Sequence, residues 1–94
     1  MTVGKGVTPP SVVYRIDPEY TEAAYRSRFQ GTVILGLTVN EFGLPVNIRV
    51  PHLTGLGLDA RAVKAVSQWR FRPGSKDGRP VSIKAEIEVN FRIL

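Results

Sequence analysis

The chain has 94 residues, enough for one domain with one modest core, because a chain of this size buries only about 60–65% of the surface that its unfolded form exposes. Hydrophobic residues make up 43% and charged residues 22%, which is ordinary for a globular domain and argues against disorder. The absence of cysteine excludes disulfides and thiolate metal sites, and the net charge of +5 favours acidic partners or anionic surfaces in a general way.

The first ten residues predict a linker or arm, because their glycines and prolines do not suit a packed element. We therefore expect a single domain over residues 11–94. No apolar stretch approaches the roughly 20 residues that span a bilayer, and no signal segment opens the chain. Any export signal or membrane anchor is expected in a part of the parent protein that precedes these residues.

Residues 11–16 form a short strand-like run that ends at Asp17-Pro18. Proline suits a first helical position and Asp17 could cap the amides that follow, so a short helix is expected from about 18–21 to 28. Acidic residues near its start and arginines near its end follow the order that the helix dipole favours. Gly31 is expected to close this helix.

An antiparallel hairpin follows. Residues 32–39 and 45–50 both alternate apolar and polar side chains, and the turn between them contains Gly43, which can adopt positive φ. After a loop over residues 51–57, apolar side chains at helical spacing predict a second helix from Leu58 to Arg70. Pro73-Gly74 should end it, and Asp77-Gly78 predicts a further turn.

The last strand carries the clearest pattern in the chain. Seven apolar residues alternate with polar ones from Val81 to Ile93, which indicates one buried and one wet face. The fold class is therefore α+β: two helices packed on one face of a three-stranded antiparallel sheet, in the order (β)αββαβ, with an extra short N-terminal strand. Residues 32–39 should lie in the centre, and the last strand should form a free edge unless Val12–Ile16 folds back to cover it.

The sequence contains no residue pattern that indicates a catalytic or metal-binding site. His52 has no second ligand at a suitable spacing, and no serine has a base placed to activate it. Glu86 and Glu88 fall on the wet face of the last strand, where cross-strand charge partners or solubility explain them better than acid–base catalysis. We expect neither an enzyme, nor a cofactor, nor a bound metal.

The run Trp69-Arg70-Phe71-Arg72 superficially resembles a nucleic-acid contact patch. Trp69, however, falls on the apolar stripe of the second helix, and Phe71 is expected to follow it inward, with both arginines left outside. The polar face of the last strand also lacks the aromatic side chains on which bases stack. We expect no nucleic-acid partner. A basic nucleic-acid-binding module remains the less favoured alternative, and it predicts an affinity that falls steeply with salt.

A set of motifs, in order, resembles the TonB C-terminal domain family over about residues 12–94. These motifs are Pro18-x-Tyr20, the strand Gly31–Val39, Gly43-x-Pro-Val46, Leu58-Asp59-x-x-Ala62, "WRFRPG" (69–74), "DGRPV" (77–81) and the closing alternating strand. Two departures stand out. Thr21 occupies a position where the family usually has proline, and the loop "VPHLTGLG" replaces a commoner short Ser-Gly link.

The resemblance implies the periplasmic domain of an inner-membrane-anchored energy transducer. Such a domain binds the N-terminal segment of an outer-membrane transporter as an added strand and transmits energy from a proton-driven inner-membrane complex, which contacts the part of the protein missing here. Carried over, the docking surface is Ile83, Lys84, Ala85, Glu86, Ile87, Glu88, Val89, Asn90 and Phe91. A homodimer formed by strand exchange, and a sensory or scaffolding tail on another membrane protein, remain open alternatives.

Overall fold

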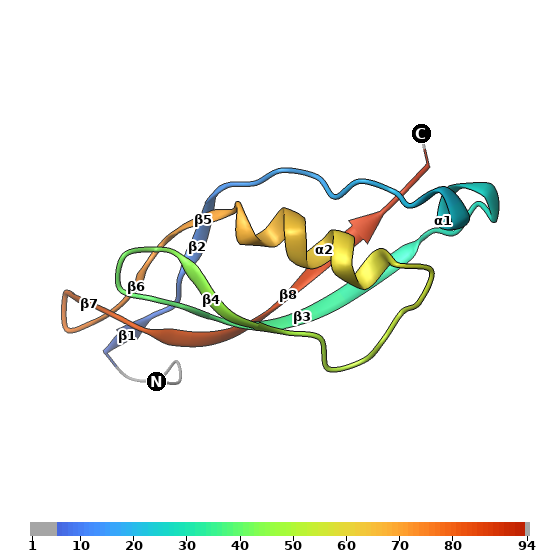
Figure 1. Ribbon diagram of the computed structural model, residues 1–94. Coiled ribbons are helices and arrows are strands. Elements are labelled where there is room, and N and C mark those ends of the chain that lie inside the picture. Colours follow the sequence, from blue (N-terminus) through green and yellow to red (C-terminus); the bar gives the residue numbers. More distant parts are fainter. Residues whose placement is uncertain (1–5, 94) are drawn as a thin grey trace.

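The computed structural model describes residues 6–93, and a three-stranded antiparallel sheet is its central element (Figure 1). Strand β3 (Gly31–Val39) lies in the middle, between β4 (Pro45–Arg49) and β8 (Ile83–Phe91). Both partners run antiparallel to β3. The predicted sheet, with the first hairpin strand in the centre and the last strand at an edge, is confirmed.

One face of this sheet carries the core. Helix α2 (Leu58–Ser67) lies across it, and the short helix α1 (Glu22–Arg26) packs near the end where β3 begins (Figure 1). The inward side chains of the strands and the apolar stripe of α2 form one cluster. Its buried members are Ala24, Val33, Leu35, Leu37, Val39, Leu58, Ala62, Val66, Trp69, Phe71, Val89 and Phe91. The sheet is thus covered on a single side, as the alternation of β8 predicts.

Helix α1 is shorter than predicted and has different ends. It is capped by Thr21, whose hydroxyl accepts a hydrogen bond from the amide of Ala24 (3.2 Å), so the expectation that Asp17 caps it is wrong. It ends at Arg26, and the chain leaves it through Arg28, which adopts a positive φ of 54°; the expected closing residue, Gly31, already belongs to β3. The family's usual proline is absent at residue 21, and threonine serves there as a cap instead.

Helix α2 ends at Ser67, three residues before the predicted end at Arg70, and the chain then enters strand β5 (Arg70–Arg72). Trp69 and Phe71 are nevertheless buried, 3% and 7% exposed, which confirms that both rings belong to the core. Arg70 and Arg72 are exposed, as expected. The alternation of side chains from Trp69 into β5 thus turns Trp69 and Phe71 inward, as a longer helix was expected to do.

Strand β2 (Ser11–Tyr14) pairs with β5, with Val12 opposite Phe71. The hypothesis that Val12–Ile16 covers the free edge of β8 is therefore wrong. The indole N–H of Trp69 donates to the carbonyl of Ile16 (2.9 Å), and this bond satisfies a buried donor that would otherwise be costly. The N-terminal segment is thus held over α2 and β5, away from the middle of β8.

Three further short strands extend the fold. Strands β6 (Gly74–Lys76) and β7 (Arg79–Val81) form a hairpin around the predicted turn at Asp77-Gly78, and β1 (Val7–Thr8) pairs with β6. Part of the expected arm, residues 1–10, is therefore a packed strand, and residues 1–5 lie outside the described residues. The molecule is elongated, with extents of 49 × 23 × 18 Å, and the hairpin of β6 and β7 lies at the end opposite to α1 (Figure 1).

Candidate docking edge

Strand β8 is long, regular and open on one side. All nine residues pair with β3 in an unbroken register from Ile83 opposite Val39 to Phe91 opposite Gly31. Within residues 6–93, no strand pairs with the other side of β8. An edge of this kind offers a row of backbone donors and acceptors to another extended chain.

The register identifies which backbone groups face outward. At the hairpin, the amide of Asn40 donates to the carbonyl of Leu44 (3.0 Å), which places the even-numbered backbone groups of β3 on the side of β4. The odd-numbered groups of β3 consequently face β8 and pair with its odd-numbered residues. The even-numbered residues of β8 must therefore direct their backbone groups to the open side. These residues are Lys84, Glu86, Glu88 and Asn90.

The opposite edge of the sheet is less suited to pairing. Strand β4 has five residues, begins at Pro45 and is followed by Pro51, and proline has no amide hydrogen to donate. Its register with β3 shifts between Gly36 and Thr38, where Asn47 adopts a positive φ of 52°. Bulges and prolines are common protections of edge strands. Strand β8 has neither.

The inward face of β8 is incompletely covered along its middle. Ile83, Val89 and Phe91 are buried, whereas Ala85 and Ile87 between them are only half-buried. At the far end, the ring of Tyr20 packs edge-on against Phe91, with ring centroids 5.6 Å apart. The N-terminal segment thus reaches the end of β8, where Asp17, Pro18 and Tyr20 border a cavity of about 440 Å³.

The outward face of β8 is polar. Near its end, the hydroxyl of Thr32 donates to Asn90 Oδ1 across the strands (2.8 Å). Glu88, by contrast, lies opposite Ile34, and Glu86 lies opposite Gly36. Of the two explanations offered for these carboxylates, a directly opposite charge partner in β3 is therefore not found, and solubility remains.

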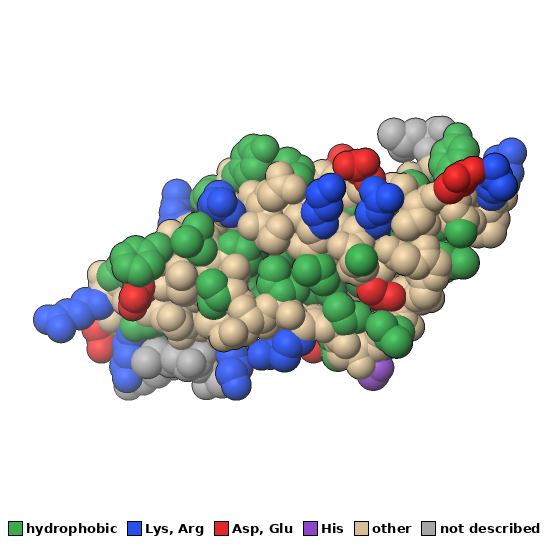
Figure 2. Space-filling view, viewed as in Figure 1, with side chains coloured by type: hydrophobic (Ala, Val, Ile, Leu, Met, Phe, Trp, Pro, Cys, Tyr) green, Lys and Arg blue, Asp and Glu red, His purple; other side chains and the backbone are tan. Residues whose placement is uncertain are grey.

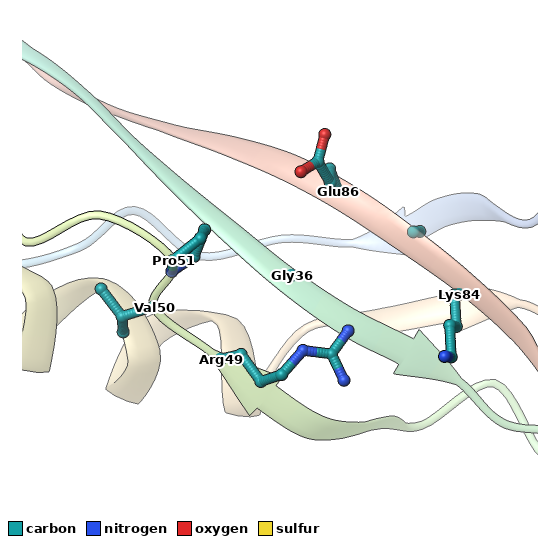
Figure 3. Close-up of a pocket in the computed structure, with 7 residues that line it drawn as sticks. Gly36, Arg49, Val50, Pro51, Lys84 and Glu86 are labelled. Carbon is teal, nitrogen blue, oxygen red and sulfur yellow. The ribbon is translucent and has the colours of Figure 1, made fainter.

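A groove of about 480 Å³ crosses the same outer face and extends to Val50 and Pro51 (Figure 3). Gly36 has no side chain to fill the floor of the groove. The guanidinium of Arg49 lies above Gly36, and a Cβ on Gly36 would be 3.4 Å from Arg49 Nη2. Lys84 points into the same space from β8. Side-chain periodicity does not predict this groove, although a glycine within a strand often marks a close approach to the backbone.

The other residues considered from the sequence lie elsewhere. His52 is exposed in the loop before α2, and within residues 6–93 no three His, Cys, Asp or Glu side chains are grouped to hold a metal ion. On the face that Figure 2 shows, lysine and arginine side chains are spread along the whole length of the molecule, with acidic side chains between them. The two helices of the described chain are too short to cross a bilayer.

Asp59 has a structural role at the start of α2. Its carboxylate accepts hydrogen bonds from the backbone amides of Thr54 and Gly55, each at 3.0 Å. Burial acts to raise the pKa of Asp59, but these hydrogen bonds outweigh it, and the pKa lies below its ordinary value. Asp59 therefore ties the preceding loop to the helix.

Comparison with known proteins places this architecture in one family. The model of the family described as Gram-negative bacterial TonB protein C-terminal matches residues 16–93, most of the chain. The chain is 28% identical over 86 residues to protein TonB of Vibrio cholerae serotype O1 and 34% identical over 77 residues to protein tonB2 of Pseudomonas aeruginosa. These matches cover 90% and 81% of the chain but only 35% and 28% of the two relatives, so the chain spans about a third of their length.

A solved structure agrees with the fold. The solution NMR structure of the Pseudomonas aeruginosa TonB CTD superposes with a TM-score of 0.70 at 21% sequence identity, covering 99% of this chain and 93% of that one. The family match itself rests on the sequence, and it extends from the residues before α1 to the end of β8. The chain therefore belongs to the family of C-terminal domains of Gram-negative bacterial TonB proteins.

Proposed function

We propose that this domain binds an extended peptide segment along the open edge of β8, from Ile83 to Phe91, by adding it to the sheet as a further strand. In the cell, the segment would be the N-terminal part of an outer-membrane transporter. The observation that carries the proposal is the nine-residue register of β8 with β3, which leaves the even-numbered backbone groups free to pair outward.

The burial pattern of β8 supports the same proposal. Because Ala85 and Ile87 are half-buried, an added strand with apolar side chains on its inner face would remove their remaining surface from water. The flanking residues Ile83 and Val89 are already buried. The middle of β8 would thus bury the most additional apolar surface on binding a partner, and its edge has neither a bulge nor a proline to prevent pairing.

Such binding should be reversible. Each added hydrogen bond contributes about 0.5–1.5 kcal/mol net, while ordering each residue of the partner costs about 1–2 kcal/mol. Backbone pairing alone therefore gives a weak complex, and side chains must supply the rest. A weak complex suits a domain that couples to a transporter and then releases it.

Membership of the family supports a proposal about the wider role of the domain. We propose that the domain is the periplasmic part of a TonB-type energy transducer anchored in the inner membrane, and that it transmits energy from a proton-driven complex in that membrane. It acts by binding and by bearing load, without catalysing a reaction. A homodimer formed by exchange of strands would use the same edge and would compete with the transporter.

Proline substitution tests the edge. Glu86→Pro or Glu88→Pro removes an outward amide while leaving the bonds to β3 intact, and its ring fills the space of the partner's carbonyl. We expect folded variants whose affinity for a transporter's N-terminal peptide falls by about tenfold or more. NMR titration would measure this, with signals of β8 and β3 shifting most in the unsubstituted protein.

Glu86→Ala and Glu88→Ala are the matched controls, because they remove the same side chain and retain the amide. They should bind nearly as well as the unsubstituted protein if the backbone carries the interaction. A folded proline variant with unchanged affinity would refute docking at this edge.

A further inference from the structure

On the outer face of β8, one basic side chain is followed along the strand by two acidic ones. Lys84 turns toward β3 and the groove over Gly36, while the carboxylate of Glu86 points away from β3 (Figure 3). Glu88 follows two residues later on the same face and is exposed. The centre of the open edge therefore carries two like charges in a chain whose net charge is +5.

Within residues 6–93, neither carboxylate forms an ion pair. Directly opposite them in β3 are Gly36 and Ile34, which carry no charge, although the guanidinium of Arg49 lies over Gly36 in the groove that Glu86 also lines. The ion pairs formed among residues 6–93 join Arg26 to Glu22 and Arg61 to Glu19, far from this edge in the chain. Side chains two apart on one strand face lie close together, so Glu88 repels Glu86, while Lys84 and Arg49 offset part of the charge of Glu86. Glu88 has no cation beside it on its own strand face until Arg92, four residues later.

The position of these residues makes the charge relevant to any added strand. Their backbone groups face the open side, so a partner residue would pair beside each of them whichever way the partner runs. In a paired ladder, neighbouring side chains on one face lie within about 4.5–5.5 Å of one another. The outward side chains of the partner would therefore contact these carboxylates.

We propose that Glu86 and Glu88 select partner strands that carry basic side chains on their outward face beside these two positions, and that they reject strands with acidic side chains there. This rests on the proposed docking at β8. Opposite charges across strands are mutually favourable and like charges are unfavourable, so the same pair both attracts and excludes. Backbone pairing determines how a partner strand binds, and the two carboxylates determine which partner strands bind most tightly.

Three synthetic peptides test the proposal. They share an alternating valine frame and differ only at the intervening positions, which carry lysine, serine or glutamate. We expect the lysine peptide to bind roughly tenfold more tightly than the glutamate peptide, with the serine peptide between them. Affinity would be measured by NMR titration at low salt, where exposed charges are least screened.

Charge reversal should invert this order. For the double variant Glu86→Lys, Glu88→Lys, the glutamate peptide should bind more tightly than the lysine peptide. Glu41→Lys, which raises the net charge half as much as the double variant, is the control for net charge. Glu41 lies in the exposed turn between β3 and β4, and the order of affinities of this variant should match that of the unsubstituted protein. An inverted order in Glu41→Lys would assign the effect to the overall charge and overturn the proposal.

The outcomes separate the two hypotheses. If the three peptides bind the unsubstituted protein equally, selection by Glu86 and Glu88 is refuted while docking at β8 stands. If none of them binds while a transporter's N-terminal peptide does, the selection is refuted and docking stands; if the transporter peptide also fails to bind, docking itself is refuted. A lysine preference that Glu86→Gln, Glu88→Gln abolishes would support both.

Discussion

At the scale of single residues, Arg28 adopts a strained left-handed backbone conformation just after the end of α1. The amide of Phe29 donates to Ala24 and that of Arg28 to Tyr25, a Schellman arrangement in which Arg28 takes the left-handed position. Glycine adopts this conformation at no steric cost, whereas arginine does not. The end of α1 is therefore a site where the sequence is not optimal for the fold.

Replacing Arg28 with glycine should stabilise the domain by about 0.5–1 kcal/mol, because it relieves this strain. Arg26→Gly, two residues earlier and within the helix, should instead destabilise it by about 1 kcal/mol. Urea unfolding of both variants measures the two effects. Effects of the same sign would contradict the assignment of residue 28 as the left-handed position.

Asp59 predicts a dependence of stability on pH. Its pKa in the folded state is lowered, net of an opposing contribution from burial, by hydrogen bonds from Gly55 and Thr54. A lowered folded pKa contributes stability that is present above the unfolded pKa and is lost as the pH falls through the folded pKa. Between about pH 5 and pH 2, the urea midpoint of Asp59→Asn should therefore fall less than that of the unsubstituted protein. Equal slopes would show that these hydrogen bonds do not stabilise the loop.

At the scale of elements, the tip of the β3–β4 hairpin is tied to β5. The amide of Phe71 donates to the carbonyl of Gly43 (2.9 Å), and Gly43 has a positive φ of 81°. A Cβ at Gly43 would lie 2.1 Å from the carbonyl oxygen of Phe71, so the backbones must move apart to admit any side chain. The hairpin and β5 approach each other as closely as glycine permits.

Gly43→Ala should accordingly destabilise the domain by at least about 2 kcal/mol, through left-handed strain together with the clash. Gly78→Ala is the matched control, because Gly78 has nearly the same φ, 82°, and a Cβ there would meet nothing within 4 Å. It should cost only the strain, about 1 kcal/mol. Thermal unfolding of the two variants compares them, and equal losses would argue against a steric role for Gly43.

The alternation along β8 predicts a pattern of hydrogen exchange. Amides of odd-numbered residues such as Ala85 and Ile87 pair with β3 and should exchange slowly, whereas those of Glu86 and Glu88 should exchange fast in the free domain. Binding of a transporter peptide should then protect the fast set. Slow exchange of Glu86 and Glu88 in the free domain would mean that this edge is already covered.

The long elements could be predicted from the sequence, whereas the short ones could not. Strand β8 is predictable because seven apolar residues alternate along and around it. Strand β5 has only three residues, and Trp69, three positions after Val66, continues the spacing of the helix instead. Pairing with β2, some 60 positions earlier in the chain, decides that segment. For the site, the open edge was foreseeable, but the direction of its backbone groups and the groove over Gly36 depend on register, which side-chain periodicity does not reveal.

At the scale of the whole molecule, the N-terminal segment acts as a strap along the fold. Strand β1 pairs with β6, β2 pairs with β5, and Tyr20 packs against Phe91 near the opposite end (Figure 1). The hydroxyl of Tyr20 also donates to the carbonyl of Phe29 (2.7 Å). Any load that reaches the domain from a preceding part of the protein therefore enters through this strap before it reaches the sheet.

The strap predicts where the folded unit begins. Among the described residues, removing residues 1–10 takes away the two-residue strand β1 and the hydrogen bond from the amide of Asp77 to the carbonyl of Gly6, and we expect a folded domain that loses about 1 kcal/mol or less. Removing residues 1–16 also deletes β2, uncovers core side chains beneath Val12 and Ile16, and leaves the indole N–H of Trp69 without its acceptor. That loss should amount to several kcal/mol, enough to unfold much of a domain whose whole stability is about 5–15 kcal/mol. Circular dichroism melting curves would compare the two truncations, and equal stability would show that β2 is dispensable and that the domain begins after Ile16.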